Sequence, residues 1–100
     1  MTDLAPKLYL VCYDIADDRR RSRIFKLLRG YGEHIQFSIF RCILSPRRFA
    51  ELHARIEPLV HRSEDQVLLV LLGKADSRKS WRATILGRPM PPPKRGAIIV

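Results

Sequence analysis

An apolar segment that runs directly into acidic and then basic residues most constrains this 100-residue chain. Residues 8–14 read LYLVCYD, and alternation puts apolar side chains on both faces as far as Asp14. A strand that is apolar on both faces is expected in the middle of a covered sheet. The residues that follow are Asp17, Asp18, Arg19, Arg20 and Arg21. The segment therefore predicts a strand-to-helix junction that joins a carboxylate, which can bind a metal, to guanidinium groups, which can bind phosphate.

The composition favours a small globular protein with a polyanionic partner. One hundred residues make a single small domain, and a hydrophobic content of 46% suffices for a packed core. Lys and Arg number 19 against 10 acidic residues, and the formal net charge of +9 favours a partner such as nucleic acid. No apolar segment approaches the roughly 18 residues of a membrane span, and the N-terminal residues lack the apolar region of a signal peptide. We therefore expect a cytoplasmic protein with no membrane partner.

Two helices are predicted from capping residues and apolar spacing. Asp17 or Asp18 is expected to cap a helix that runs to about Tyr31, a role we favour over metal binding for both carboxylates. Ser45 followed by proline is typical of the start of a second helix, which Pro58 is expected to kink or end. The two apolar stripes are Ile24, Leu27, Leu28 and Tyr31, then Phe49, Leu52, Ile56, Leu59 and Val60.

The remaining apolar segments predict three more strands and a tail strand. Residues 35–44 alternate with mixed polarity, which favours a strand nearer the sheet edge. Residues 66–73 are apolar on both faces and predict another central strand, whereas residues 81–86 carry a weaker strand pattern. Residues 88–96 are rich in proline and predict an extended arm. The apolar residues 97–100 are expected to add to a sheet edge as a short strand.

This order, β-α-β-α-β-β with a C-terminal tail strand, predicts the α+β class and a ferredoxin-like sandwich. The domain would span residues 1–87, and residues 88–100 would form the Pro-rich arm and the tail strand. Two helices cover only one face of such a sheet. The other face is still apolar, and a second copy of the chain is its simplest cover, so we expect a homodimer through that face.

From residue 8 to residue 73 the chain resembles the Cas-two (Cas2) family of small CRISPR-associated proteins of spacer acquisition, whose members are often described as endoribonucleases. The resemblance rests on three features in the same order: YDIADDRRR at residues 13–21, a helix ending at Tyr31 and Gly32, and QFSIF at residues 36–40. It implies a ferredoxin-like homodimer. It also implies a divalent metal, usually Mg²⁺, near the aspartate that ends the first strand, which here is Asp14.

The resemblance implies two activities. Some family members cleave phosphodiester bonds in RNA or DNA, which would make Asp14 both the catalytic residue and the metal ligand. The family dimer also serves as a scaffold between copies of the Cas-one (Cas1) integrase and holds the DNA to be inserted, a role that needs no catalysis. The residues at positions that family members use around nucleic acid are Arg19, Arg20, Arg21, Phe37 and Ser38. Tyr13 and Phe37 can also contact a base or a sugar, and the alternative for the three arginines is a solvated basic helix face.

Three functions stay open on the residues alone. The first is a metal-dependent nuclease, including a stand-alone ribonuclease, in which a two-fold axis would bring two Asp14 carboxylates together. The second is a non-catalytic DNA scaffold. The third is a regulatory module that binds a metabolite, against which the charge of +9 and the lack of a Gly-rich effector loop argue. Candidates for a general base are His34, His53 and His61.

Overall fold

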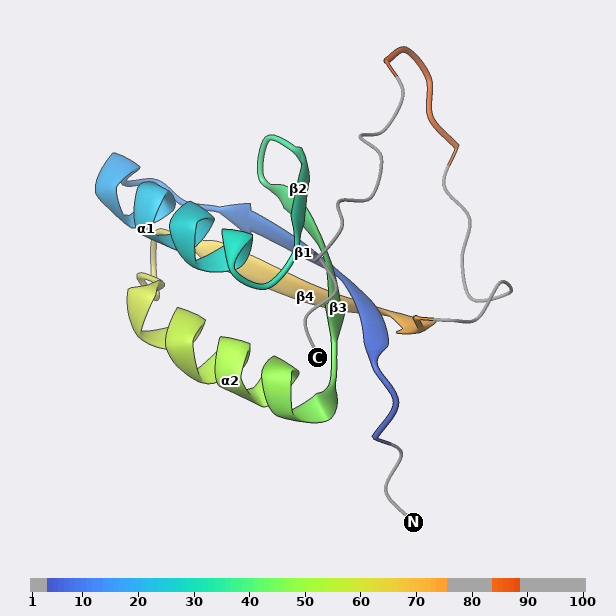
Figure 1. Cartoon of the computed structure of the whole chain (residues 1–100). Coiled ribbons are helices and arrows are strands. Elements are labelled where there is room, and N and C mark those ends of the chain that lie inside the picture. Colours follow the sequence, from blue (N-terminus) through green and yellow to red (C-terminus); the bar gives the residue numbers. More distant parts are fainter. Residues whose placement is uncertain (1–3, 76–83, 89–100) are drawn as a thin grey trace.

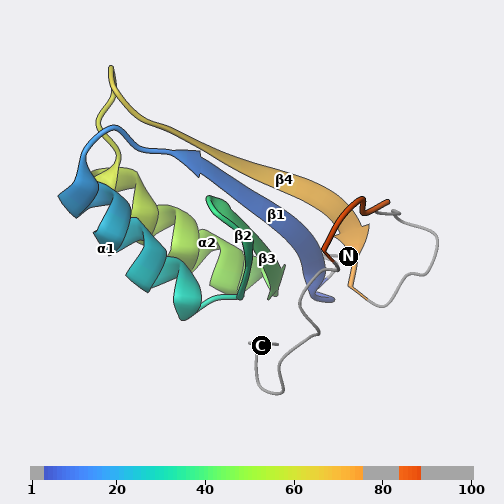
Figure 2. The same cartoon turned by 90° about the horizontal axis from the view of Figure 1, so that it is seen from above.

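The computed structural model describes residues 4–75 and 84–88 of the chain. Its elements are β1 (Lys7–Asp14), α1 (Asp18–Arg29), β2 (Glu33–Gln36), β3 (Ile39–Leu44), α2 (Pro46–Ile56), the 3₁₀ helix η1 (Glu57–Leu59) and β4 (Gln66–Lys74). The four strands form one antiparallel sheet in the order β2-β3-β1-β4. Both α-helices pack on the same face of this sheet (Figures 1 and 2). The α+β class and the ferredoxin-like arrangement are therefore confirmed. No helix within the described ranges is long and apolar enough to cross a membrane.

Strand β1 lies in the middle of the sheet, as its sequence predicts. It pairs with β3 on one side and with β4 on the other. Tyr9, Val11 and Tyr13 point to the helix layer and are buried there. The ring of Tyr9 stacks on Phe49 of α2, with 4.7 Å between the ring centroids. Burial of large side chains such as these contributes about 1.5–3 kcal/mol each, so β1 anchors the core on this face.

The single strand predicted over residues 35–44 is wrong, because the chain folds there into a hairpin. Strands β2 and β3 pair with each other, and Phe37 and Ser38 form the turn between them. This turn contains no Gly, Pro, Asn or Asp, the residues that usually mark one in a sequence. It is held from a distance, since Tyr13 donates its backbone N–H to the Ser38 carbonyl over 3.0 Å. The element order is therefore β-α-β-β-α-β in place of β-α-β-α-β-β.

The central position predicted for residues 66–73 is also wrong. Strand β4 pairs only with β1 among the described residues and forms an edge of their sheet. Val67 and Leu69 pack against the core, whereas Leu68 and Val70 are 48% and 41% exposed on the face without helices. Strand β4 is therefore apolar on both faces because one face packs on the core and the other belongs to the apolar sheet surface that the helices leave uncovered.

The C-terminal predictions concern mostly undescribed residues. Within the strand predicted over 81–86, the described residues 84–86 are not in a strand. The tail strand over 97–100 and the Pro-rich arm beyond residue 88 lie outside the described residues.

The helix boundaries follow the caps that the sequence predicts. The carboxylate of Asp17 accepts a hydrogen bond of 2.9 Å from the backbone N–H of Arg20, which closes the first turn of α1. This hydrogen bond also lowers the pKa of Asp17. At the start of α2 the Ser45 hydroxyl accepts from the N–H of Arg48 over 3.2 Å. Helix α2 ends at Ile56, and Pro58 lies in the 3₁₀ turn that follows.

Gly32, between α1 and β2, lies where the backbone passes close to β3. A Cβ atom there would lie 2.4 Å from the Arg41 carbonyl oxygen and 2.5 Å from the sulfur of Cys42. The Arg41 oxygen and the Cys42 Cα atom, at 2.9 Å, belong to the backbone of a strand in the middle of the sheet, so they cannot move without disturbing its pairing. Gly30, at the end of α1, has only one such neighbour, at 3.4 Å, and adopts ordinary helical angles.

We predict that Gly32→Ala destabilises the fold and that Gly30→Ala does not. Overpacking of this kind costs about 1–3 kcal/mol, and each kcal/mol lowers the Tm of a domain of this size by about 4–8 °C. Thermal unfolding followed by circular dichroism compares the two variants with the wild type. Equal melting temperatures for all three chains would contradict the close approach at Gly32.

Candidate functional site at the end of β1

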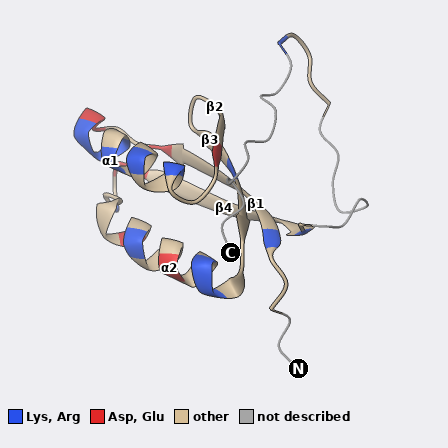
Figure 3. Ribbon diagram, viewed as in Figure 1, with Lys and Arg blue, Asp and Glu red and all other residues tan. Residues whose placement is uncertain are grey.

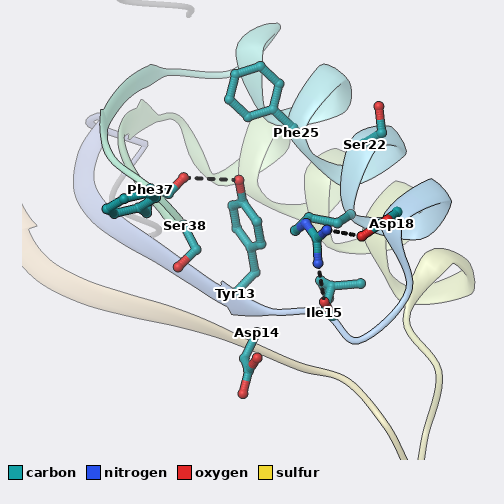
Figure 4. A pocket seen from close by; sticks show the side chains of 9 residues that line it. Tyr13, Asp14, Ile15, Asp18, Ser22, Phe25, Phe37 and Ser38 are labelled. Carbon is teal, nitrogen blue, oxygen red and sulfur yellow. Dashed lines mark hydrogen bonds and ion pairs between the residues drawn. The ribbon is translucent and has the colours of Figure 1, made fainter.

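Asp14 ends β1 and has an exposed side chain, the position from which the sequence predicts catalysis and metal binding. Because side chains alternate along a strand, Asp14 points to the face opposite that of Tyr13. Figure 4 shows the Asp14 carboxylate directed away from Tyr13 and Ile15. Asp14 also pairs with Gln66, the first residue of β4, while on the other side Tyr13 donates its backbone N–H to the β2–β3 turn. The carboxylate therefore projects from a well-fixed strand end.

A solvent-open pocket of about 550 Å³ lies between the end of β1, the first turns of α1 and the β2–β3 turn. Its lining residues are Tyr13, Asp14, Ile15, Asp18, Arg21, Ser22, Phe25, Phe37 and Ser38. Of the predicted site residues, the pocket thus brings together Tyr13, Arg21, Phe37 and Ser38. Asp14 borders it with its carboxylate turned away (Figure 4).

In the β2–β3 turn, the backbone of Phe37 is held by hydrogen bonds while the Phe37 ring is exposed. The carbonyl of Phe37 accepts a hydrogen bond of 3.3 Å from the Tyr13 hydroxyl. An imidazole nitrogen of His34 lies 2.6 Å from the same oxygen. Burial raises the pKa of Tyr13, so its hydroxyl keeps its proton and remains a donor at neutral pH. The Phe37 side chain is 95% exposed, which leaves a rigidly mounted aromatic ring at the rim of the pocket.

The three predicted arginines have different environments. Arg19 is exposed. Arg20 forms ion pairs with Asp65 and Glu64, at 2.8 Å and 3.0 Å. The guanidinium of Arg21 donates to the carbonyl of Ile15 over 3.0 Å and also pairs with Asp18.

Basic residues continue along α1, beyond the three predicted positions (Figure 3). Arg23 and Lys26 are both exposed and follow Arg19 at the i+4 and i+7 spacing of one helix face. We call Arg19, Arg23 and Lys26 the α1 basic row. Arg23 and Lys26 are not among the predicted site residues, although helical spacing from Arg19 marks both.

Asp65, which the sequence analysis also missed, binds both sides of the strand-to-helix junction. Its side chain is fully covered, with 0% of its surface exposed. The carboxylate accepts from the Arg20 guanidinium, from the backbone N–H of Ala16 over 2.9 Å and from that of His61 over 2.8 Å. The hydrogen bonds from Arg20, and then those from the two backbone groups, lower the pKa of Asp65. No local pattern marks this residue, because its main partners lie more than 40 positions away in the chain.

The donor set of one chain fits an open magnesium site and not a closed one. Within residues 4–75 and 84–88, no group of three or more His, Cys, Asp or Glu side chains is placed to hold a metal ion. Mg²⁺ needs only one or two carboxylates when water and substrate phosphate complete its octahedron. Asp14 can supply one carboxylate, whereas Asp18 is engaged by Arg21 and Asp17 by the helix N-terminus. A magnesium ion at Asp14 would therefore share its remaining positions with water, substrate or a second chain.

None of the three candidate general bases lines the pocket. His34 lies nearest, because it contacts the Phe37 carbonyl. His53 lies 3.4 Å from Glu57 on the exposed side of α2. His61 has its imidazole within 3.2 Å of the Ser63 hydroxyl, in the loop before β4.

Residues 7–80 match the family described as CRISPR associated protein Cas2. The chain is 41% identical over 97 residues to the CRISPR-associated endoribonuclease Cas2 1 of Synechocystis sp., covering 93% of this chain and 99% of the relative. It is 39% identical over 93 residues to the CRISPR-associated endoribonuclease Cas2 of Geobacter sulfurreducens, with 93% and 97% covered.

Solved structures show the same likeness. A hypothetical protein from Thermus thermophilus superposes with a TM-score of 0.74 at 32% identity, over 89% of this chain and 99% of the other. The Cas2 of Streptococcus pyogenes, solved at pH 6.5, superposes with a TM-score of 0.68 at 29% identity, over 80% and 99%.

We predict that Asp65 stabilises the chain in a pH-dependent manner. Its pKa is lower in the folded chain than in the unfolded one, so its contribution is complete above about pH 4 and is lost as the pH falls further. Asp65→Asn keeps an acceptor oxygen and removes the charge. Urea unfolding should therefore show a less stable variant at neutral pH, with a difference from wild type that narrows in acid.

Glu64→Gln is the matched control, because the Glu64 side chain is 53% exposed and shares the same arginine. Exposed ion pairs contribute about 0–1 kcal/mol, so this variant should stay close to the wild type at every pH. A stability difference for Asp65→Asn that does not change with pH would refute an ionic role.

Proposed function

Since the chain belongs to the Cas2 family of CRISPR-associated proteins, we propose that it is a magnesium-dependent endonuclease of CRISPR immunity that hydrolyses phosphodiester bonds in RNA or DNA at Asp14. The two relatives named above, which cover 93% of the chain, are called endoribonucleases, and this supports a nuclease. The observation that carries the proposal for this chain is the exposed carboxylate of Asp14 at a fixed strand end, beside an open pocket. The net charge of +9 suits a polyanionic substrate.

Each residue around the end of β1 has a distinct role in this proposal. Asp14 anchors the cation, which when bound would neutralise charge on the phosphoryl oxygen and make a water molecule more acidic. The Tyr13 hydroxyl holds the Phe37 carbonyl, so the exposed Phe37 ring is placed to stack on a base of a single-stranded segment. Arg19 is free to neutralise phosphates that flank the cleaved bond.

We further propose that the active form is a homodimer through the face without helices. Leu68 and Val70 are exposed on this face, and their partners in the β1–β4 register, Cys12 and Leu10, extend the same apolar surface. Asp14 follows on that side of β1, because it lies two residues beyond Cys12. A two-fold axis across this face would bring the carboxylates of two chains toward one another, which would complete the carboxylate pair that magnesium accepts.

A second candidate function is a DNA scaffold that acts with the Cas1 integrase in acquiring new spacers. The α1 basic row favours it, since its exposed side chains lie on the helix layer while the Asp14 carboxylate points to the opposite face. A duplex bound along α1 would be held by phosphate contacts, which need no catalysis and no base recognition. The two functions are compatible, because phosphate contacts along α1 leave the Asp14 carboxylate free on the opposite face.

We predict that Asp14→Asn lowers magnesium-dependent cleavage by at least about 100-fold, because the metal ligand is lost while the shape is kept. Affinity for the substrate should change by less than about threefold, since phosphate contacts dominate binding. Cleavage of labelled single-stranded RNA and DNA by purified protein, with and without Mg²⁺, measures the first effect. Glu57→Gln, which removes an exposed carboxylate that does not line the pocket, serves as the control. Full cleavage by Asp14→Asn would rule out the nuclease proposed at this site.

We predict that the double variant Arg19→Gln, Arg23→Gln weakens duplex DNA binding and makes it less dependent on salt. Each lost phosphate contact should reduce the slope of log K against log salt by about 0.9. Fluorescence anisotropy over a series of salt concentrations gives both quantities. The double variant Arg47→Gln, Arg55→Gln removes the same charge from exposed positions on α2 and should have the smaller effect. Equal losses in the two double variants would show that the charge alone matters, not its place on α1.

A further inference from the structure

We propose that Arg20 and Asp65 form a positioning pair that holds Asp14 in place for phosphodiester cleavage, so that Arg20 acts inside the protein and not as a phosphate ligand. This inference rests on the proposed function. It assigns a role to Asp65, which no sequence motif marks, and it separates Arg20 from its two neighbours in the run of three arginines.

The contacts of Asp65 tie three segments to one carboxylate. One oxygen accepts from the backbone N–H of Ala16, in the loop between β1 and α1. The other accepts from Arg20 Nε, in the first turns of α1, and from the N–H of His61, in the loop before β4. None of the Asp65 side-chain surface is exposed, so the carboxylate depends on these protein donors for its hydrogen bonds.

The Arg20–Asp65 pair lies close to Asp14 along the chain, both after the end of β1 and before the start of β4. Ala16 is two residues beyond Asp14, and Asp65 immediately precedes Gln66, the partner of Asp14 in β4. The carboxylate thus fixes the exit of β1 and the entry of β4 together. Movement of either segment would displace Asp14, and displacement by about 1 Å can lower a catalytic rate by about 100-fold.

The geometry of Arg20 is that of an internal partner. Its Nε donates to Asp65 over 2.8 Å, and its Nη2 donates to Glu64 over 3.0 Å and to Asp65 over 3.2 Å. Only 25% of its side chain is exposed. A phosphate that took the Nε and Nη2 donors of Arg20 would displace Asp65 and leave a covered carboxylate without its counter-charge, which is unfavourable. Arg19 is exposed and, among the described residues, does not neutralise a covered carboxylate, so it can bind a phosphate without breaking such an ion pair.

The test compares Arg20→Gln with Arg19→Gln in steady-state cleavage with Mg²⁺, well below the melting temperature of each variant. We expect Arg20→Gln to lower kcat by about 10- to 100-fold with KM changed less than about threefold. Arg19→Gln should instead act mainly on KM, because it removes a binding contact. Arg20→Lys, which restores a cation beside Asp65, should recover part of the lost kcat. Overturning results are a raised KM with normal kcat in Arg20→Gln, which marks a phosphate ligand, or no recovery in Arg20→Lys.

A readout that needs no activity separates this inference from the nuclease proposal. Hydrogen exchange measured by NMR should be faster at the Ala16 amide in Arg20→Gln than in wild type, while the Cys42 amide in β3 keeps its rate. If the wild type fails to cleave any substrate, the proposed nuclease function is wrong. The exchange rate at Ala16 then tests by itself whether the Arg20–Asp65 pair fixes the end of β1. Unchanged exchange at Ala16, or equal acceleration at both amides, would overturn the positioning pair.

Discussion

The alternation of side chains at the end of β1 is the constraint on which the rest of the structure depends. Tyr13 must enter the helix layer, because its aromatic ring is buried there, and Asp14 must then face the other way. Neighbouring strands on both sides of β1 prevent a slip of one residue, which would bury a carboxylate and expose the core. The direction of the candidate catalytic group therefore follows from the packing of the residue before it.

The same constraint shapes the pocket. Tyr13 is buried and also hydrogen-bonds to the β2–β3 turn through its backbone N–H and its hydroxyl. A residue of the central strand thereby holds the turn that carries the exposed Phe37 ring. Two residues beyond Tyr13 the chain leaves β1 and enters a loop, whose Ala16 amide donates to Asp65. Two independent sets of contacts, one on each side, thus fix the segment that contains Asp14.

The run of three arginines shows how neighbouring identical residues can differ in function. A charged side chain that is nearly surrounded by protein must find a counter-charge, and Arg20 finds Asp65 and Glu64. Arg19 stays exposed and joins the α1 basic row. Arg21 lies between these cases, because it lines the pocket while it is bound to Ile15 and Asp18. Charge density alone would have assigned all three to nucleic acid.

Sequence patterns predicted the features that depend on local chemistry. The central strand, the Asp17 and Ser45 caps and the end of α2 before Pro58 all follow from residues close in the chain. The features that failed depend on distant residues.

The β2–β3 turn has no Gly, Pro, Asn or Asp and is held by Tyr13, more than 20 positions earlier. Strand β4 is apolar on both of its faces, and this pattern is the same for a central strand and for an edge strand. The pattern therefore could not show that β4 lies at an edge of the described sheet. The Arg20–Asp65 pair spans 45 positions, beyond any periodic pattern in the sequence.

Within residues 4–75 and 84–88, one chain offers a single well-placed carboxylate, and we propose that a second chain across the face without helices completes the metal site. The most direct measurement is the number of Mn²⁺ ions, as a substitute for Mg²⁺, that the purified protein binds, determined by electron paramagnetic resonance during titration. We predict one ion for every two chains and no such binding in Asp14→Asn. One ion for each chain, or binding that survives the loss of the Asp14 charge, would contradict it.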